Sequence, residues 1–181
     1  MNSKLMTVMI SSIFSAFLSD AYGVDLNFNG ELVTFPCEVI EGTPEDVVFY
    51  TRSAKYFHYE PATTPTQPFK ISLQCDTSIT AWNVVRVKFD GQPEPGMGEF
   101  SNQFIKVDGV NTGFLAVGLY DTDGSTPIEL GEETIAESIV SRDRVDLNFS
   151  AFVKATPSAL ANKDVIPGDY RAVATFELFY E

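Results

Sequence analysis

Histidine, cysteine and basic residues are scarce in this chain. Its 181 residues include one histidine, His58, and two cysteines, Cys37 and Cys75. A zinc centre or a histidine-based acid–base site needs more of these side chains than the chain has. Lysine and arginine number 12 against 25 aspartates and glutamates, which gives a net charge of −13. That charge argues against nucleic acid or an anionic membrane surface as a partner.

A long apolar run occurs only near the amino terminus. Lys4 precedes an apolar run from Leu5 to Leu18, and small residues follow at Ala21 and Gly23. This order is typical of a secretory signal peptide, and the run is shorter than the roughly 20 residues that a membrane anchor needs. We predict a signal peptide over residues 1–23, with cleavage after Gly23 or, alternatively, after Ala21. Residues 24–181 would then be exported and fold as one domain.

Export to an oxidising compartment would give the two cysteines a structural role. Cys37 and Cys75 would pair as a disulfide there, and the alternative is two buried free thiols. By loop-closure entropy, the cross-link would contribute about 4 kcal/mol to stability.

Apolar residues recur with period two through most of the exported chain, which predicts half-buried β-strands. The segments with this alternation are residues 24–32, 69–75, 85–89, 145–153 and 170–180. Turn-forming pairs such as Asp90-Gly91 and Pro167-Gly168 separate them, and one helical turn fits Thr156 to Lys163. Short strands at this spacing predict an all-β fold, a β-sandwich.

Motifs that carry chemistry are weak in this sequence. Residues 121–124 read Asp-Thr-Asp-Gly, but their spacing favours a hairpin turn over a calcium loop. His58 lies among Tyr56, Phe57 and Tyr59 with no second histidine or cysteine to act with, so we interpret it as a structural residue of an aromatic strand. We therefore predict no catalytic residue, no metal ligand and no cofactor.

The two ends of the exported chain are its most informative parts. Alternating apolar strands are predicted at both ends, over residues 24–32 and 170–180. Exposed strand edges invite pairing with other chains. The pattern alone leaves two possibilities open: both are ordinary strands of a closed sandwich, or one of them is meant for another chain.

Several motifs resemble those of the chaperone–usher pilins, the fimbrial subunits of Gram-negative bacteria. They are Gly30-x-Leu32 before Pro36-Cys37, the Ile71–Cys75 segment, residues 118–124, Gly168 as the fourteenth residue from the carboxyl terminus, and a penultimate Tyr180. The resemblance covers residues 24–181 and is closest to adaptor pilins at the tip of P pili and related fimbriae.

This resemblance implies an incomplete immunoglobulin-like β-sandwich that lacks its last strand and is completed by a donated strand. The donor strand of this chain would be residues 24–33, with Val24, Leu26, Phe28, Gly30 and Leu32. The groove and chaperone-contact strand would carry Gly168, Tyr170, Ala172, Ala174, Phe176, Leu178 and Tyr180. The implied partners are neighbouring pilins, a periplasmic chaperone and an outer-membrane usher.

The function implied is that of a structural minor subunit, a tip adaptor that supports cell adhesion from the cell surface. One alternative is a repeating subunit of the tip fibre. Another is a sugar-binding adhesin that uses an exposed aromatic cluster at Tyr56, Phe57 and Tyr59.

Overall fold

The computed structural model describes residues 32, 34–41, 44 and 46–181. The chain divides into two units, Met1–Val33 and Thr34–Glu181, and the described helices and strands all belong to the second unit. Its elements in chain order are β1 (Cys37–Val39), the 3₁₀ helix η1 (Ala54–His58), β2 (Gln67–Cys75), β3 (Val84–Gly91), the 3₁₀ segment η2 (Pro95–Gln103), β4 (Phe104–Lys106), β5 (Asp108–Gly109), β6 (Leu115–Tyr120), β7 (Glu137–Ser138), β8 (Arg144–Ala155), α1 (Pro157–Asn162), β9 (Tyr170–Arg171) and β10 (Ala174–Tyr180).

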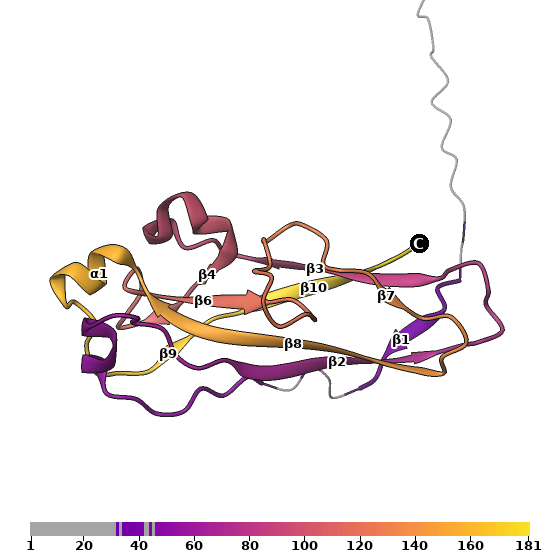
Figure 1. The fold of residues 1–181 in the computed structure, drawn as a ribbon, viewed down its shortest axis with the longest axis horizontal. Coiled ribbons are helices and arrows are strands. Elements are labelled where there is room, and N and C mark those ends of the chain that lie inside the picture. Colours follow the sequence, from indigo (N-terminus) through magenta and orange to yellow (C-terminus); the bar gives the residue numbers. More distant parts are fainter. Residues whose placement is uncertain (1–31, 33, 42–43, 45) are drawn as a thin grey trace, which may run out of the picture. The chain divides into compact units, whose positions relative to one another are not determined.

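The strands form two main antiparallel sheets (Figure 1). The larger sheet has the order β1-β2-β8-β6-β4 and the smaller has the order β10-β3-β7. The short strands β5 and β9 pair with each other. Figure 1 shows η1 and α1 at the end of the molecule where β9 lies, and β1 toward the opposite end.

The core fills the space between the two sheets, as the period-two pattern predicts. Leu147 of β8 and Val87 of β3 are each 1% exposed. Phe149 of the larger sheet meets Phe89 of the smaller one edge to face, with ring centroids 5.1 Å apart. Alternate inward side chains of strands in the two sheets therefore pack into one apolar layer, and the predicted β-sandwich is confirmed.

Three local predictions from the sequence turn out differently in the structure. Gly91 does not form a turn with Asp90, because it continues β3 and pairs with Ala174. The expected single strand over residues 170–180 is interrupted at Ala172 and Val173, where the chain changes its pairing from β5 to β3. His58 belongs to a 3₁₀ helix rather than a strand. The alternation of apolar residues continues through the break at Ala172 and Val173, so the sequence pattern does not reveal the change of pairing partner there.

The predicted helical turn at residues 156–163 is confirmed as α1. The hydroxyl of Thr156 accepts a hydrogen bond from the backbone N–H of Ala159, which caps the helix. Lys163 ends the helix in the left-handed conformation at φ 61°. Glycine is the usual residue there because it has no Cβ to clash.

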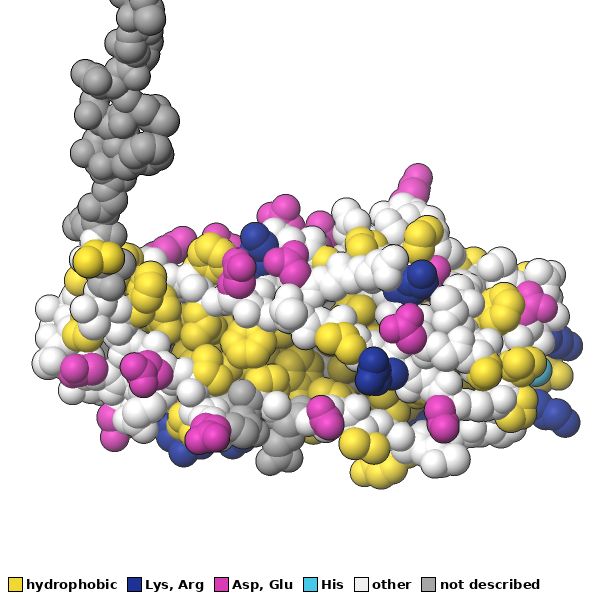
Figure 2. Space-filling model, turned by 180° about the vertical axis from the view of Figure 1, so that it is seen from behind, with side chains coloured by type: hydrophobic (Ala, Val, Ile, Leu, Met, Phe, Trp, Pro, Cys, Tyr) yellow, Lys and Arg dark blue, Asp and Glu magenta, His cyan; other side chains and the backbone are white. Residues whose placement is uncertain are grey.

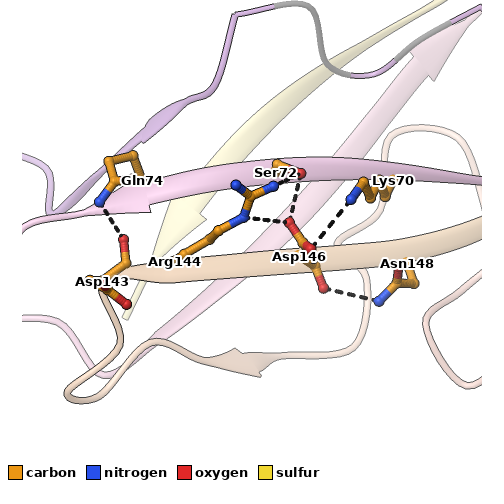
Figure 3. Close-up of polar contacts among 7 residues, drawn as sticks. All are labelled: Lys70, Ser72, Gln74, Asp143, Arg144, Asp146 and Asn148. Carbon is orange, nitrogen blue, oxygen red and sulfur yellow. Dashed lines mark hydrogen bonds and ion pairs between the residues drawn. The ribbon is translucent and has the colours of Figure 1, made fainter.

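The outer face of the larger sheet carries a ladder of polar contacts between β2 and β8 (Figure 3). Asp146 accepts a hydrogen bond from the Ser72 hydroxyl at 2.6 Å, and it pairs with Arg144 at 3.3 Å and Lys70 at 3.4 Å. The bond from Ser72, and after it the two cations, hold the pKa of Asp146 below 3.8. This face therefore meets solvent with polar groups that satisfy one another within the chain.

Candidate functional site

An apolar groove with a volume of about 590 Å³ runs beside β10. Its floor is formed by core side chains of both sheets, and its two walls are β9–β10 and the segment that carries Pro44, Asp46, Val47 and Phe49. Figure 2 shows the face that carries hydrophobic side chains gathered in a long hollow between polar and charged rims. The lining residues are Pro44, Asp46, Val47, Phe49, Phe69, Phe89, Ile105, Val117, Leu119, Ala151, Tyr170, Arg171, Ala172, Val173, Ala174 and Phe176.

One wall of the groove is a strand with a free long edge. β10 pairs along its whole length with β3, from Ala174 opposite Gly91 to Tyr180 opposite Val85. It is the outermost strand of its sheet, and among the described residues nothing pairs with its other edge. Phe176 and Leu178 are only half-buried. A strand edge of this kind exposes backbone N–H and C=O groups that can bind a further strand.

The opposite wall was not predicted from the sequence. Residues 46–50 belong to no regular strand or helix, and Val47 and Phe49 are half-buried and pack against the core. Val48 and Tyr50 are 76% and 73% exposed. The four residues are all apolar or aromatic, so no alternation marked the segment. The ring centroids of Phe49 and Tyr170 lie 6.4 Å apart, so the two walls come together at the end of the groove beside β9.

Near Tyr180, a disulfide links the first two strands of the larger sheet, and Tyr180 of the smaller sheet contacts them. Cys37 and Cys75 form the predicted disulfide and lie opposite each other in β1 and β2. The hydroxyl of Tyr180 donates a hydrogen bond to the backbone oxygen of Cys37 at 3.0 Å. The Tyr180 ring stacks on Phe35 at 5.4 Å. Burial raises the pKa of Tyr180 from 10.0 to about 12, because the phenolate would lose hydration.

The last residue extends the pairing of β10 with β3. The backbone N–H of Glu181 donates to the oxygen of Val84 at 3.1 Å, and the Glu181 backbone oxygen accepts from Asn83 and Val84 at 2.6 and 3.0 Å. Its side chain lies 3.4 Å from the Nε of Arg86. This end of β10 is thus tied firmly to the smaller sheet.

The structure brings together four of the residues predicted for the groove strand. Tyr170, Ala172, Ala174 and Phe176 line the cavity, whereas Leu178 and Tyr180 lie further along β10 and outside its lining. Gly168 precedes β9, and a Cβ there would collide with the side chain of Val110. Of the predicted donor residues, Val24, Leu26, Phe28 and Gly30 lie outside the described residues, as does the predicted signal peptide, and Leu32 is exposed.

The aromatic cluster considered for sugar binding is largely used within the fold. Phe57 is 4% exposed, and the hydroxyl of Tyr56 donates to the backbone oxygen of Thr63 at 2.8 Å. Only Tyr59, at 62%, is mainly exposed. His58 donates from Nε2 to the backbone oxygen of Val165 at 2.8 Å, so it links η1 to the segment before β9.

Other functional features are few in the part of the chain that the structure describes. Asp121 to Gly124 form a turn in which the carboxylate of Asp123 accepts bonds from Ser125 and Thr126. No group of three or more His, Cys, Asp or Glu side chains among these residues is placed to hold a metal ion. None of the described helices is long and apolar enough to cross a membrane.

Comparisons with known proteins give the groove a context. Residues 26–181 match the model of the family described as fimbrial protein. Protein PrsK of Escherichia coli is 39% identical over 163 residues, which is 88% of this chain and 89% of that protein. The fimbrial adapter PapK of Escherichia coli is 38% identical over the same shares. The crystal structure of the P pilus rod subunit PapA shares the fold, with a TM-score of 0.65 at 20% identity over 81% of this chain and 100% of PapA. This chain belongs to the fimbrial protein family.

Proposed function

We propose that this chain is an adaptor subunit at the tip of a chaperone–usher pilus, where it accepts a strand from one neighbour and donates its own residues 24–33 to another. The observation that carries the proposal is the apolar groove beside the free edge of β10. The adaptor role is supported by the 38% identity to a protein named as a fimbrial adapter. As a fimbrial subunit the chain is exported, assembled with other pilins and displayed on the cell surface, and it is not an enzyme.

A donated strand would satisfy both needs of the groove at once. Its backbone would pair with the free edge of β10, and its alternate side chains would fill the cavity over the aromatic floor. Burial of four apolar side chains would contribute about 6–12 kcal/mol before the entropy of ordering is subtracted. Such a gain suits a non-covalent joint that has to hold a fibre together outside the cell.

The proposed donor segment has the pattern that such a groove accepts. Val24, Leu26, Phe28 and Leu32 would point into the neighbour's groove, and Gly30 would let the two backbones approach closely. Before assembly, the periplasmic chaperone would lend a strand to this chain, and the usher would exchange that strand for a neighbour's.

A thermal melt of the oxidised, exported protein tests the proposal. Deletion of residues 24–33 leaves the unit from Thr34 to Glu181 intact and prevents self-donation. Decapeptides of donor type, with four alternating apolar residues and a central glycine, are added alongside the chain's own segment 24–33. We expect a foreign donor peptide to raise the melting midpoint by more than about 10 °C.

The self peptide separates the adaptor from a repeating subunit. An adaptor joins unlike subunits, so its own segment 24–33 should leave the midpoint unchanged. A self peptide that stabilises as well as a foreign one would make the chain a repeating subunit of the tip. A high midpoint that no peptide changes would mean that the sandwich is complete on its own, and the proposal would fail.

A further inference from the structure

Three exposed cations gather at the end of the molecule where the groove begins. They are Arg52, Lys55 and Lys163, which come from the segment before η1, from η1 and from the end of α1, and we name them the basic pole. Figure 2 shows Lys and Arg side chains beside the chain's one histidine at this end. In a chain of net charge −13, such a concentration of positive charge needs a physical reason.

Two of the three cations of the basic pole, Arg52 and Lys163, lie on aromatic rings, and none of the three forms an ion pair with a described residue. The guanidinium of Arg52 lies 4.9 Å from the ring centroid of Tyr56, and the ammonium of Lys163 lies 4.9 Å from that of Tyr59. The carboxylates of Glu60 and Asp164 belong to adjoining segments. Yet within the part of the chain that the structure describes, no carboxylate lies within ion-pair distance of these cations. The ring contacts hold the charges of Arg52 and Lys163 in place, and all three charges remain available to another molecule.

The basic pole is continuous with the groove. Tyr170 lines the groove at this end, and burial raises its pKa while the nearby Arg52 offsets part of the rise. Lys163 adds a second sign of function, because it takes a left-handed φ of 61° where glycine fits best. At this position a lysine, unlike glycine, provides a cation, and that cation lies on the exposed ring of Tyr59.

The direction of the donated strand would bring the donor's body to this end. Every strand pair of the described domain is antiparallel, and antiparallel pairing is the more stable arrangement per residue. A strand antiparallel to β10 ends beside Ala174 and Tyr170, where β10 begins. Its carboxyl end, which continues into the body of the donor subunit, would therefore leave the groove at the basic pole.

In a donor subunit, the end of the body that follows the donor segment would face the basic pole. In this chain the corresponding end, beside β1, is acidic. The residues that follow its own proposed donor segment, together with the loops beside β1, expose Glu38, Asp76 and Asp143. Of the two arginines nearby, Arg144 is already paired with Asp146, which leaves Arg142. We infer that the basic pole binds an acidic surface on the body of the donor subunit, as a second contact outside the groove that rests on the proposed strand donation.

Charged extensions of a donor peptide test this inference. The decapeptide that stabilises best in the melting experiment is labelled and extended by four glutamates or four lysines, at its carboxyl or its amino end. Binding to the exported protein is measured by fluorescence anisotropy in about 50 mM salt, where surface charges are weakly screened. We expect the carboxyl-terminal glutamates to bind about fivefold tighter than the carboxyl-terminal lysines. Amino-terminal extensions should show no such difference.

The controls separate charge from folding. The triple variant Arg52→Gln, Lys55→Gln, Lys163→Gln should lose the difference between extensions and keep the affinity for the unextended peptide. Lys88→Gln removes a cation that also lies on a ring, that of Phe179 at 5.6 Å, but away from the basic pole, and it should keep the difference. Lys163→Gly should reduce the difference while leaving the melting midpoint unchanged or higher, because glycine relieves the left-handed backbone.

The outcomes distinguish the two proposals. The inference is wrong if both carboxyl-terminal extensions bind equally, if the triple variant keeps the difference, or if only amino-terminal charges matter, which would mean a parallel donor strand. If not even the unextended peptide binds, strand donation itself fails, and the second contact fails with it.

Discussion

Strands β8 and β10 have the same alternating pattern but different surroundings. β8 pairs with β2 on one side and β6 on the other, and its inward residue Leu147 is 1% exposed. β10 pairs only with β3 among the described residues, and its inward residue Phe176 stays half-buried beside the groove. Period-two patterning therefore identifies a strand and its apolar face. It does not tell whether the chain itself supplies a neighbour on each edge.

The largest effect is expected in β8. Leu147→Ala leaves a cavity in the core between the sheets, and it should lower the free energy of unfolding by about 2–5 kcal/mol in denaturant titrations. The loss should be the same with and without a donor peptide, because Leu147 is covered by its own chain. The exposed neighbour Asn148→Ala is the control and should change stability by less than about 0.5 kcal/mol. A loss at Leu147 that depends on the peptide would break the contrast with β10.

A smaller and peptide-dependent effect is expected in β10. Phe176→Ala should cost about 1–2 kcal/mol in the peptide-free protein, because the ring is only half-buried. It should also weaken binding of a donor peptide at least about tenfold in anisotropy titrations, since the ring forms part of the groove wall. Glu177→Ala, which changes an exposed neighbour on the same strand, should leave the affinity nearly unchanged. Equal peptide affinities for Phe176→Ala and the native protein would show that this wall does not contact the donated strand.

The hydrogen bond from Tyr180 of β10 to the backbone of Cys37 in β1 should contribute less to the free energy of unfolding. Tyr180→Phe removes the hydrogen bond to Cys37 and should lower stability by about 1 kcal/mol at neutral pH. The native pKa of Tyr180 is raised from 10.0 to about 12, so the unfolded chain loses this proton first. The stability that comes from the buried neutral phenol is complete below pH 10 and is lost as the pH rises toward 12.

Unfolding measured across this alkaline range checks the role of Tyr180. Tyr180→Phe should lose less stability between pH 10 and 12 than the native protein. Tyr59→Phe is the matched control at an exposed tyrosine and should follow the native curve. Identical curves for Tyr180→Phe and the native protein would show that the buried Tyr180 hydroxyl does not stabilise the fold.

The smallest effect is expected on the polar outer face. Asp146→Asn removes the charge that accepts the bond from Ser72, but the site is exposed and screened by solvent, so the loss of stability at neutral pH should be below that of Tyr180→Phe. The native pKa of Asp146 lies below 3.8, so the contribution is present above that pH and fades as the pH falls further. The free energy of unfolding of the variant should therefore fall less steeply with decreasing pH in the acid range than that of the native protein. Glu99→Gln, a change at an exposed carboxylate, is the control. A steeper fall than in the native protein would contradict this assignment.

Much of the sandwich could be predicted from local sequence. Alternation at Val145, Leu147 and Phe149 predicted β8, and β2 and β3 were found in the same way. The pairing of Cys37 with Cys75 followed from export and from their number. The strand β6 was not marked by alternation, because all but one of its residues are buried and the segment reads as a continuous apolar run.

Half of the groove was missed for a related reason. The wall at Val47 and Phe49 lies in a run of four apolar residues, and these two side chains pack against the core although the segment belongs to no strand. The break at Ala172 and Val173 was missed because alternation continues through it on both sides. The proposed donor residues 24–32 were identified from alternation and family resemblance, and their role remains a prediction.

The sequence by itself determined the alternating strands β2, β3, β8 and β10 with their apolar faces, the acidic charge and the disulfide, because these depend on residue type and on spacings of two along the chain. Tertiary structure alone decided which strand edge has no partner, where the groove begins and ends, and which cations gather at its mouth. Those features depend on contacts between segments far apart in sequence, such as β10 with β3, η1 with α1 and Tyr180 with Cys37. No local pattern encodes such contacts, because they form only when the whole domain closes around one core.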